Sequence, residues 1–506
     1  MGRVGLKFEG ISTGRIGSIV SVVLVGLLAM PAFAAEAPVA QIDQAAMDRA
    51  FQRLGSEFIQ ASRADGLSIA VVANGRARFY NFGSVSRDKP RTPTESTVYE
   101  IGSISKVFTS LLLAHAAIEK KIDLHDDVRR YLPGEYPNLA FQDTPVRLID
   151  LVNTTSALPE NLPDGAKIAG NAGPDEAPFL IVQALKRYSD ATLLEDLRSQ
   201  ALVDRPGATP RHSNLAAKLA GIVVEKAYGD SYENLLARYI ERPFGMASGT
   251  DLSRSASFAT GYNERHLAMP ALDMRTLFPV GGLRYSAADM AGFLIAELAA
   301  SDASIRLSQQ PAWGSVDNMA VAFNWTLDRT VDSKLRLRAS GGTFGFSSHI
   351  EMYPELGYGV VLLANRPGEA QNQLQDLASQ AMRDIRGKPA ALAALEVALE
   401  KGDYRDVGKI VAKVRRRHPE LHLTEDFLNQ WGGRLLDGSP KRAVGLFAYN
   451  AARWPNSWNA FDSLAEAYKR SGDTKRAIAN YRRSLELNAG NAYAADELKK
   501  LEKAEE

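Results

Sequence analysis

The sequence contains no cysteine and only seven histidines among its 506 residues. The absence of cysteine excludes disulfides, thiolate metal sites, a cysteine nucleophile and a lipid anchor on a cysteine. His418 and His422 have the spacing of a helical metal pair, but Pro419 lies between them and no cysteine completes a site. No phosphate-binding glycine loop is present. We therefore expect no metal and no other cofactor.

An excess of charge of one sign is also missing, because 60 Lys and Arg balance 59 Asp and Glu to a net charge of +1. This balance provides no overall attraction for a polyanion, so we expect no nucleic-acid partner. Composition does not indicate disorder either, since 45% of the residues are hydrophobic. A chain of this length can fill more than one core, because single cores stop growing near ~250–300 residues.

Long apolar runs occur only near the N-terminus. Arg3, Lys7 and Arg15 precede an apolar run over residues 16–30, and Ala32-Phe33-Ala34 has the small-x-small pattern of a cleavage site. Residues 1–34 are therefore predicted to be a signal peptide. A membrane anchor is the alternative, but the run is short for a span of ~20 residues. We expect a periplasmic or secreted protein with no membrane span after cleavage.

Two predicted hairpins enclose a set of predicted helices. Asn74-Gly75 joins the strand-like segments 67–73 and 76–82, and Asn-Gly favours a type I′ turn. A second hairpin is predicted from 349–353 and 358–364. Apolar spacing predicts helices over 41–63, 105–119 and 214–227, whereas much of 159–178 is rich in Pro, Gly, Asn and Asp and is predicted to be loop. Strands at both ends predict one α/β (α+β) domain over residues 41–386, whose sheet is closed by the two ends of the domain.

The region 389–506 differs in character, since its pattern is helical throughout. A shift of 34 residues aligns Lys441-Arg442-Ala443 with Lys475-Arg476-Ala477, and Gly438 with Gly472. This period is that of tetratricopeptide repeats, whose stacked helix pairs form a concave surface. We predict an all-α repeat domain and a possible protein partner on it; an ordinary helical bundle is the alternative.

The clearest chemical signal is Ser103-Ile104-Ser105-Lys106. Positions three apart share one face of a helix, so the Lys106 amine can lie beside the Ser103 hydroxyl. A serine is inert until a base takes its proton, and a desolvated lysine can have a low enough pKa to do so. Ser-x-x-Lys alone is a weak signal. Ser105 is an internal contrast, because its i+3 neighbour is Phe108, which cannot act as a base.

The context of this motif is specific. Ser-x-x-Lys occurs in β-lactamases and penicillin-binding proteins, and residues 46–366 resemble the class C β-lactamase-related serine hydrolases, including D-alanyl-D-alanine carboxypeptidases. Besides the Ser103 motif, the blocks that carry the resemblance follow in order: Leu151-Val152-Asn153-Thr154-Thr155-Ser156-Ala157-Leu158-Pro159, Arg211-His212-Ser213-Asn214, Arg242-Pro243-Phe244-Gly245-Met246, Gly281-Gly282-Leu283-Arg284-Tyr285-Ser286, and Ser340-Gly341-Gly342-Thr343-Phe344-Gly345-Phe346.

The resemblance implies roles for particular residues. Ser103 would be the nucleophile that forms an acyl-enzyme, and Lys106 its activating neighbour. The backbone N–H groups of Ser103 and Gly342 would form an oxyanion hole, with Gly341 and Thr343 beside it. Asn214 would orient Lys106 or the substrate amide.

Two positions depart from the family pattern. The family usually has Tyr-x-Asn where this chain has His212-Ser213-Asn214. Histidine is a competent general base, so we assign His212 a catalytic role; a residue tolerated after loss of activity is the alternative.

At the second position the family has Lys or His two residues before the first glycine, where this chain has Ala339. That cation would bind the carboxylate of a β-lactam or of a terminal D-alanine. Arg338 is adjacent, but neighbours on a strand face opposite sides, and only a bulge would turn it inward.

These observations predict an exported serine hydrolase acting through an acyl-enzyme on an ester, amide or peptide. Its partner would be a small-molecule or peptide substrate. The alternative is a catalytically impaired member of the family that binds peptidoglycan fragments or a protein.

Overall fold

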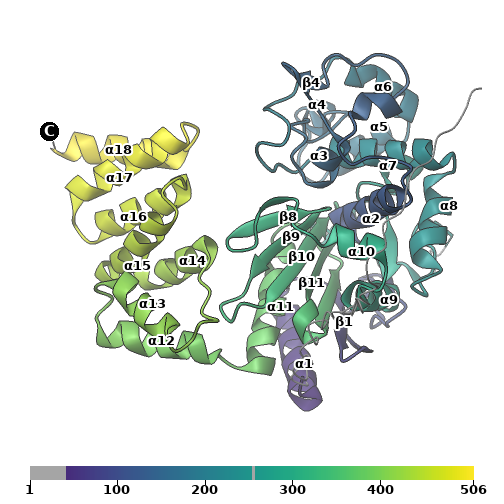
Figure 1. Cartoon of the computed structure of the whole chain (residues 1–506). Helices are drawn as coiled ribbons and strands as arrows, with labels where there is room; N and C mark the ends of the chain where they lie inside the picture. The colour runs from purple at the N-terminus through teal and green to yellow at the C-terminus, as the bar shows by residue number, and fades with distance from the viewer. Residues whose placement is uncertain (1–41, 254–256, 506) are drawn as a thin grey trace, which may run out of the picture. The chain divides into compact units, whose positions relative to one another are not determined.

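The structure, a computed structural model, describes residues 42–253 and 257–505. The predicted signal peptide, residues 1–34, lies outside the described residues. An eight-stranded antiparallel sheet in the order β2-β1-β12-β11-β10-β9-β8-β7 forms the centre of the fold (Figure 1). Its strands are β1 (Gly66–Ala73), β2 (Arg76–Gly83), β7 (Trp313–Ser315), β8 (Met319–Ala322), β9 (Trp325–Arg329), β10 (Leu335–Gly342), β11 (Ser347–Tyr353) and β12 (Tyr358–Ala364).

The two ends of the domain meet within the sheet, in its second and third strands. β1 pairs with β12 from Leu67↔Ala364 to Ala73↔Tyr358, so an early strand lies beside the last one. Both predicted hairpins are confirmed, β1 with β2 and β11 with β12. Asn74 and Gly75 have φ angles of 52° and 72°, as a type I′ turn requires at its two central residues.

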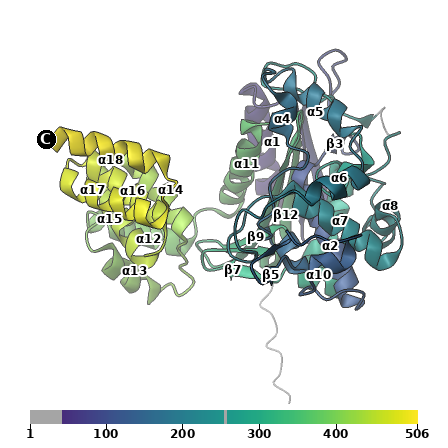
Figure 2. The same ribbon diagram turned by 90° about the horizontal axis from the view of Figure 1, so that it is seen from above.

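Helices cover both faces of the sheet, and Figures 1 and 2 show them on opposite sides. α1 (Gln44–Gln60) and α11 (Glu369–Arg386) pack together on one face, where Phe51 and Leu374 are fully buried. The prediction of a helix over 41–63 is confirmed, but the helix starts later and ends earlier than predicted. It starts at Gln44 because the Asp43 side chain accepts a hydrogen bond from the Ala45 N–H and caps the helix.

On the other face, the main buried helices are α2 (Ser105–Ile118), α7 (Asn214–Tyr228) and α9 (Ala287–Ala299). Leu111, Leu112 and Leu113 of α2 are fully buried, which explains why apolar residues occur on all sides of this helix. The prediction of helices over 105–119 and 214–227 is therefore confirmed within one residue. Shorter helices on this side are α8 (Tyr232–Leu236) and α10 (Ala303–Ser308).

A helical lobe lies between α2 and α7 in the chain. It contains α3 (Leu148–Val152), α4 (Gly165–Ala169), α5 (Ala177–Leu185) and α6 (Asp190–Leu197). The prediction of loop over much of 159–178 is wrong for α4 and for the start of α5. The Asp164 side chain accepts hydrogen bonds from the Ala166 and Lys167 N–H groups, and this cap starts a helix that the composition did not indicate.

Small antiparallel pairs complete the domain: β3 (Val98–Glu100) with β6 (Arg284–Ser286), and β4 (Ala140–Phe141) with β5 (Thr144–Pro145). β3 leads directly into the 3₁₀ turn Gly102–Ile104 and then into α2. This strand–turn–helix connection places the Ser-x-x-Lys motif against the last residues of β10, an interior strand of the large sheet.

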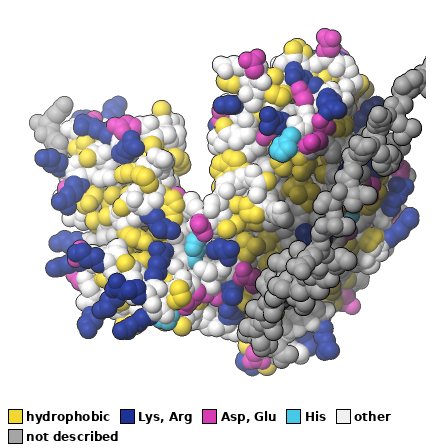
Figure 3. Space-filling view, viewed as in Figure 1, with side chains coloured by type: hydrophobic (Ala, Val, Ile, Leu, Met, Phe, Trp, Pro, Cys, Tyr) yellow, Lys and Arg dark blue, Asp and Glu magenta, His cyan; other side chains and the backbone are white. Residues whose placement is uncertain are grey.

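The chain continues after α11 as helices only. They are α12 (Ala390–Lys401), α13 (Val407–Arg415), α14 (Glu425–Leu436), α15 (Pro440–Arg453), α16 (Trp458–Arg470), α17 (Thr474–Leu487) and α18 (Ala492–Glu505). Figure 3 shows many Lys and Arg side chains on the visible face of these helices. Across residues 42–253 and 257–505, none of the helices combines the length and the apolar character that a bilayer crossing requires.

Candidate active site

Ser103 and Lys106 lie side by side, as their spacing predicted. A hydrogen bond of 2.7 Å joins Lys106 Nζ to Ser103 Oγ, and Nζ also donates to the Val280 carbonyl oxygen at 2.8 Å. Ser103 lies in the 3₁₀ turn just before α2, and Lys106 lies in the first turn of that helix. Gly102 has a φ of 53°, and a Cβ there would lie 2.4 Å from the Gly342 nitrogen. Only glycine therefore lets the turn approach β10 this closely.

Lys106 is buried, with 3% of its surface exposed. Burial lowers its pKa to about 7, and the negative charge of Glu160 opposes that shift only in part. A substantial fraction of the amine is therefore neutral near pH 7 and able to accept a proton. This lysine meets the requirement for a base beside a serine nucleophile.

His212 lies in the segment before α7 and is the second base next to Ser103 Oγ. Its Nε2 atom is 3.2 Å from Ser103 Oγ, and its Nδ1 atom is 3.5 Å from Glu160 Oε1. Burial lowers the pKa of His212, the positive charge of Lys106 lowers it further, and Glu160 opposes both effects. The imidazole is therefore neutral at pH 7, with a lone pair available for a proton.

Glu160 was missed by sequence reasoning. It follows the Leu151–Pro159 block directly, and it meets His212 because two hydrogen bonds hold the segments together. Ser213 Oγ donates to the Pro159 carbonyl oxygen at 2.8 Å, and the Asn214 N–H donates to the Glu160 carbonyl oxygen at 2.8 Å. Neither contact has a signal in the sequence, since 54 residues separate the partners in each.

Asn214 also lines the site, but its side-chain amide donates to Asn161 Oδ1 at 2.7 Å. The predicted contact partner was Lys106 or a substrate. The structure therefore places Asn214 at the cavity wall, where Asn161 takes one of its amide hydrogens.

The two glycines of β10 pack against the serine turn. A Cβ on Gly341 would lie 2.0 Å from the Ile101 carbonyl oxygen and 2.8 Å from the Ser103 nitrogen, so a side chain is excluded there. The Thr343 N–H donates to the Phe346 carbonyl oxygen, so in the antiparallel alternation the neighbouring Gly342 N–H points away from β11. Thr343 and Gly342 both line the cavity.

The neighbouring Arg338 does not supply the cation that position 339 lacks. β10 and β11 pair without interruption from Leu337↔Met352 to Gly342↔Ser347, which leaves no bulge to rotate Arg338. Arg338 instead forms an ion pair with Asp328 at 3.3 Å. The expectation that Arg338 does not replace the missing cation is confirmed.

A second serine–histidine pair lies next to this position. Ser340 Oγ is 2.8 Å from His349 Nδ1, and His349 Nε2 is 3.7 Å from Glu351 Oε2. His349 and Glu351 are completely buried. Burial alone would raise the pKa of Glu351, but the hydrogen bond with His349 and the charge of Arg336 outweigh it and bring the pKa to about 2.

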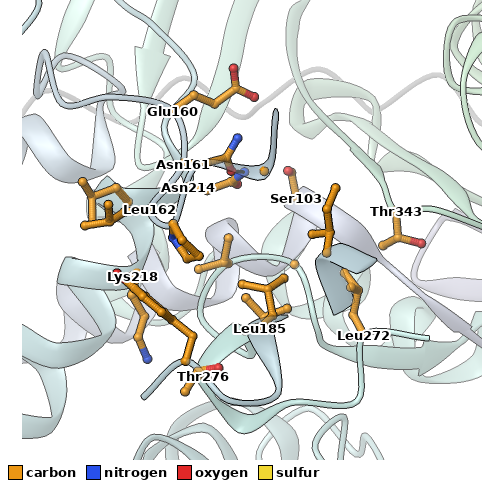
Figure 4. A pocket seen from close by; sticks show the side chains of 18 of the residues that line it. Ser103, Glu160, Asn161, Leu162, Leu185, Asn214, Lys218, Leu272, Thr276 and Thr343 are labelled. Carbon is orange, nitrogen blue, oxygen red and sulfur yellow. Dashed lines mark hydrogen bonds between the residues drawn. The ribbon is translucent and has the colours of Figure 1, made fainter. Parts of the chain in front are cut away.

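A cavity of about 570 Å³ opens onto Ser103 (Figure 4). Its volume lies within the range of ~300–1,000 Å³ that is usual for small-molecule sites. Glu160, Asn161 and Asn214 lie along one side in the view of Figure 4, and Leu162, Leu185 and Leu272 surround the interior. Ser103, Lys106, His212 and a cavity of substrate size are therefore together.

Comparison with known proteins agrees with this geometry. Residues 47–382 match the profile of the family described as Beta-lactamase. A β-lactamase of Pseudomonas fluorescens is 23% identical over 347 residues, which cover 60% of this chain and 88% of that protein. A β-lactamase of Escherichia coli K12 is 25% identical over 354 residues, which cover 61% of this chain and 86% of that protein.

Among solved structures of similar fold is one from Pseudomonas syringae. It is described as a β-lactamase/D-alanine carboxypeptidase, and the match has a TM-score of 0.56 and 20% identity over 68% of this chain and 100% of that chain. The predicted fold is confirmed: a β-lactamase/transpeptidase-like domain with an antiparallel sheet flanked by helices, followed by a helical C-terminal region.

Proposed function

Because this chain belongs to the β-lactamase family, we propose that it is a serine hydrolase that works through an acyl-enzyme on Ser103. The observation that carries this proposal is the 2.7 Å contact between Ser103 Oγ and a buried lysine whose pKa is lowered to about 7. The substrate class is an ester, an amide or a peptide bond.

Acylation begins with proton transfer from Ser103. The neutral Lys106 amine accepts the proton while Oγ attacks the substrate carbonyl carbon, so the Oγ–C bond forms and the carbonyl electron pair moves onto its oxygen. Collapse of this oxyanion breaks the bond to the leaving alcohol or amine. Lys106 gives the proton that it holds to the oxygen or nitrogen of the leaving group, either directly or through His212.

The oxyanion is stabilised by two backbone donors in this proposal, the N–H groups of Ser103 and Gly342. Support comes from the direction of the Gly342 N–H and from the close approach of Gly341 to Ser103, which leaves no room for a Cβ. Each such donor contributes about 3–4 kcal/mol to the transition state. Thr343 and Asn214 would position the substrate along the cavity wall.

Deacylation needs a base for water once the leaving group has gone. His212 Nε2 would accept the water proton as the water oxygen attacks the acyl carbon, and the imidazolium then returns that proton to Ser103 Oγ as the Oγ–C bond breaks. Glu160, 3.5 Å from Nδ1, would stabilise the transient positive charge. The product is a free carboxylic acid, and the enzyme regains its starting state.

Within the family we place the chain with the class C-related branch, on the ordered blocks around Ser103, Asn214 and Gly341. Ala339 argues against efficient recognition of a terminal carboxylate. We therefore favour an esterase, amidase or unusual peptidase over a β-lactamase.

We retain three further proposals from the sequence. The protein is exported after cleavage near residue 34, and a hydrolase domain over 41–386 precedes a repeat domain over 389–506 that binds a protein partner. The repeat is supported by helix spacing, because α15 begins at Pro440 and α17 at Thr474, which is 474 − 440 = 34 residues later.

A fluorophosphonate probe and an activated acetate ester test the proposal. The wild-type protein should be labelled and should hydrolyse the ester, and Ser103→Ala should lose both properties. Equal labelling of Ser103→Ala would reject the assignment. Ligand binding without any covalent adduct would instead favour the alternative that departures such as His212 and Ala339 reflect a catalytically impaired binding protein.

A further inference from the structure

The interior of the cavity is apolar on the side away from Glu160. The side chains that form this wall come from four segments of the chain and are Leu162, Ile168, Leu185, Leu215, Leu272 and Leu277. We propose that this wall holds an unbranched aliphatic acyl chain, so that the substrate is a carboxylic ester with an alkyl acyl group of several methylenes. This inference rests on the proposed acyl-enzyme at Ser103.

The wall is open to a ligand rather than closed by packing. Leu162, Leu185 and Leu272 are each only partly buried, although they point inward (Figure 4). Binding is favoured when a ligand removes apolar surface of the cavity from water, because this lowers the free energy of the complex. An alkyl chain extending from Ser103 would cover these three side chains together.

Charge in the cavity disfavours an anionic substrate. Lys218, the cation at the wall beside Leu215, forms an ion pair with Asp190 at 2.7 Å. Glu160 at the rim would repel a carboxylate, and position 339 supplies no cation. A neutral alkyl group therefore fits the cavity better than a peptide that ends in a carboxylate.

The acyl side, rather than the alcohol side, of the ester is assigned to this wall. His212 has 50% of its side chain exposed and Glu160 has 64%, so these groups lie at the solvent side of Ser103. The leaving alcohol must meet the proton donor and then escape, which places it at that side. The acyl group stays on Ser103 Oγ and occupies the remaining space.

The chemical step is the one described above, with an alkyl group on the carbonyl carbon. The Ser103 Oγ–C bond forms and the ester C–O bond to the alcohol breaks, and the alcohol leaves with the proton from Ser103. Water then releases the fatty acid. No oxidant, reductant or further co-reactant is required.

Two ester series test the inference on the full chain. In p-nitrophenyl esters from acetate to octanoate, kcat/KM should rise about fourfold for each methylene until the cavity is filled, which corresponds to about 0.8 kcal/mol per methylene. In alkyl acetates, where only the alcohol lengthens, kcat/KM should change much less. A gain with the alcohol chain but not the acyl chain would overturn the assignment.

Variants locate the effect in the cavity. Leu185→Trp should lower the octanoate-to-acetate ratio of kcat/KM at least tenfold. Gln183→Trp, which adds the same bulk at an exposed position of the same helix, should leave the ratio unchanged. Fluorophosphonate labelling of Ser103 in each variant reports an intact site, and the wild-type series decides the question if Leu185→Trp does not fold.

The outcomes separate this inference from the proposed function. Hydrolysis of acetate esters with no preference for longer acyl chains would overturn the inference and leave the serine hydrolase intact. Absence of both Ser103 labelling and ester hydrolysis in the wild type would overturn both.

Discussion

Two serines of this protein each contact a histidine that in turn contacts a glutamate, yet the surroundings of the two serines differ. Ser103 lies 3.2 Å from His212, with Glu160 behind it, and Ser340 lies 2.8 Å from His349, with Glu351 behind it. The serine–histidine distance is therefore shorter at Ser340 than at Ser103. The order Ser–His–Glu therefore does not identify the nucleophile.

The difference lies in the lysine that, of the two serines, contacts only Ser103 and in the burial of the two histidines. Lys106 provides Ser103 with a base of lowered pKa, and the β10 backbone lies against the Ser103 turn. Ser340 also lines the cavity, but its partner His349 is completely buried, and so is Glu351, which His349 and Arg336 hold ionised. We interpret Ser340–His349–Glu351 as a structural polar cluster of the sheet and Ser103 as the reactive serine.

The largest expected effect separates the two serines directly. Ser103→Ala should lower kcat/KM for an activated ester by at least about 10⁴-fold, because the nucleophile is lost. Ser340→Ala should lower it less than about tenfold. Steady-state kinetics on both variants checks this, and similar losses in the two would refute the distinction.

Lys106→Met should lower kcat/KM by about 10³-fold, since general-base catalysis contributes about 10²–10⁴-fold. In the wild type the base must be neutral, and Lys106 loses its proton as the pH rises through about 7. The kcat/KM of the wild type should therefore fall about tenfold for each pH unit below that value.

The control for this variant is its stability. Burial of Lys106 costs free energy in the wild type, because the amine loses either its hydration or its proton. Methionine removes this cost, so Lys106→Met should unfold at no lower temperature than the wild type. A variant that loses activity only because it unfolds, or a wild-type profile that is flat between pH 5 and 7, would contradict the role of Lys106.

His212→Ala should lower kcat by about 10²-fold, and the acyl-enzyme should accumulate because the base for water is missing. Rapid-quench mass spectrometry would show a larger acylated fraction than in the wild type. His212→Tyr, which restores the residue usual in the family, should recover part of the rate. A His212→Ala variant with an unchanged deacylation rate would remove His212 from the mechanism.

The smallest effect is expected for Glu160→Gln. Half or more of the side chain is exposed in both Glu160 and His212. The ion pair of Glu160 with the transient His212 imidazolium therefore contributes about 0.2–1 kcal/mol, or about a 1.4- to fivefold change in kcat. Glu195→Gln, a change at an exposed glutamate of α6, serves as the matched control. A loss for Glu160→Gln as large as that for His212→Ala would mean that Glu160 does more than stabilise the imidazolium.

Local patterns predicted the parts of the site that depend on neighbours in the chain. The i, i+3 spacing of Ser103 and Lys106 and the Asn74-Gly75 turn are local, and the structure has both. Contacts across the chain were not accessible in this way. Glu160 meets His212 only through the hydrogen bonds between two loops, and Ser340 meets His349 only through the β10–β11 register.

The cavity wall shows the same limit. α4 lies in a stretch whose Pro and Gly content predicted loop, and its side chain Ile168 lines the cavity together with Leu185 of α5. Composition reports the average tendency of a segment, whereas one cap at Asp164 and packing against the lobe decide its local conformation. The chemistry was therefore more predictable from sequence than the shape of the substrate site.

Mass spectrometry of the intact protein, followed by peptide mapping, tests the central claim most directly. After brief exposure to a p-nitrophenyl alkanoate and acid quenching, we predict one acyl group per chain, located on the peptide that contains Ser103. An acyl group on the peptide that contains Ser340, or a chain that turns over the ester with Ser103 never modified, would contradict the account.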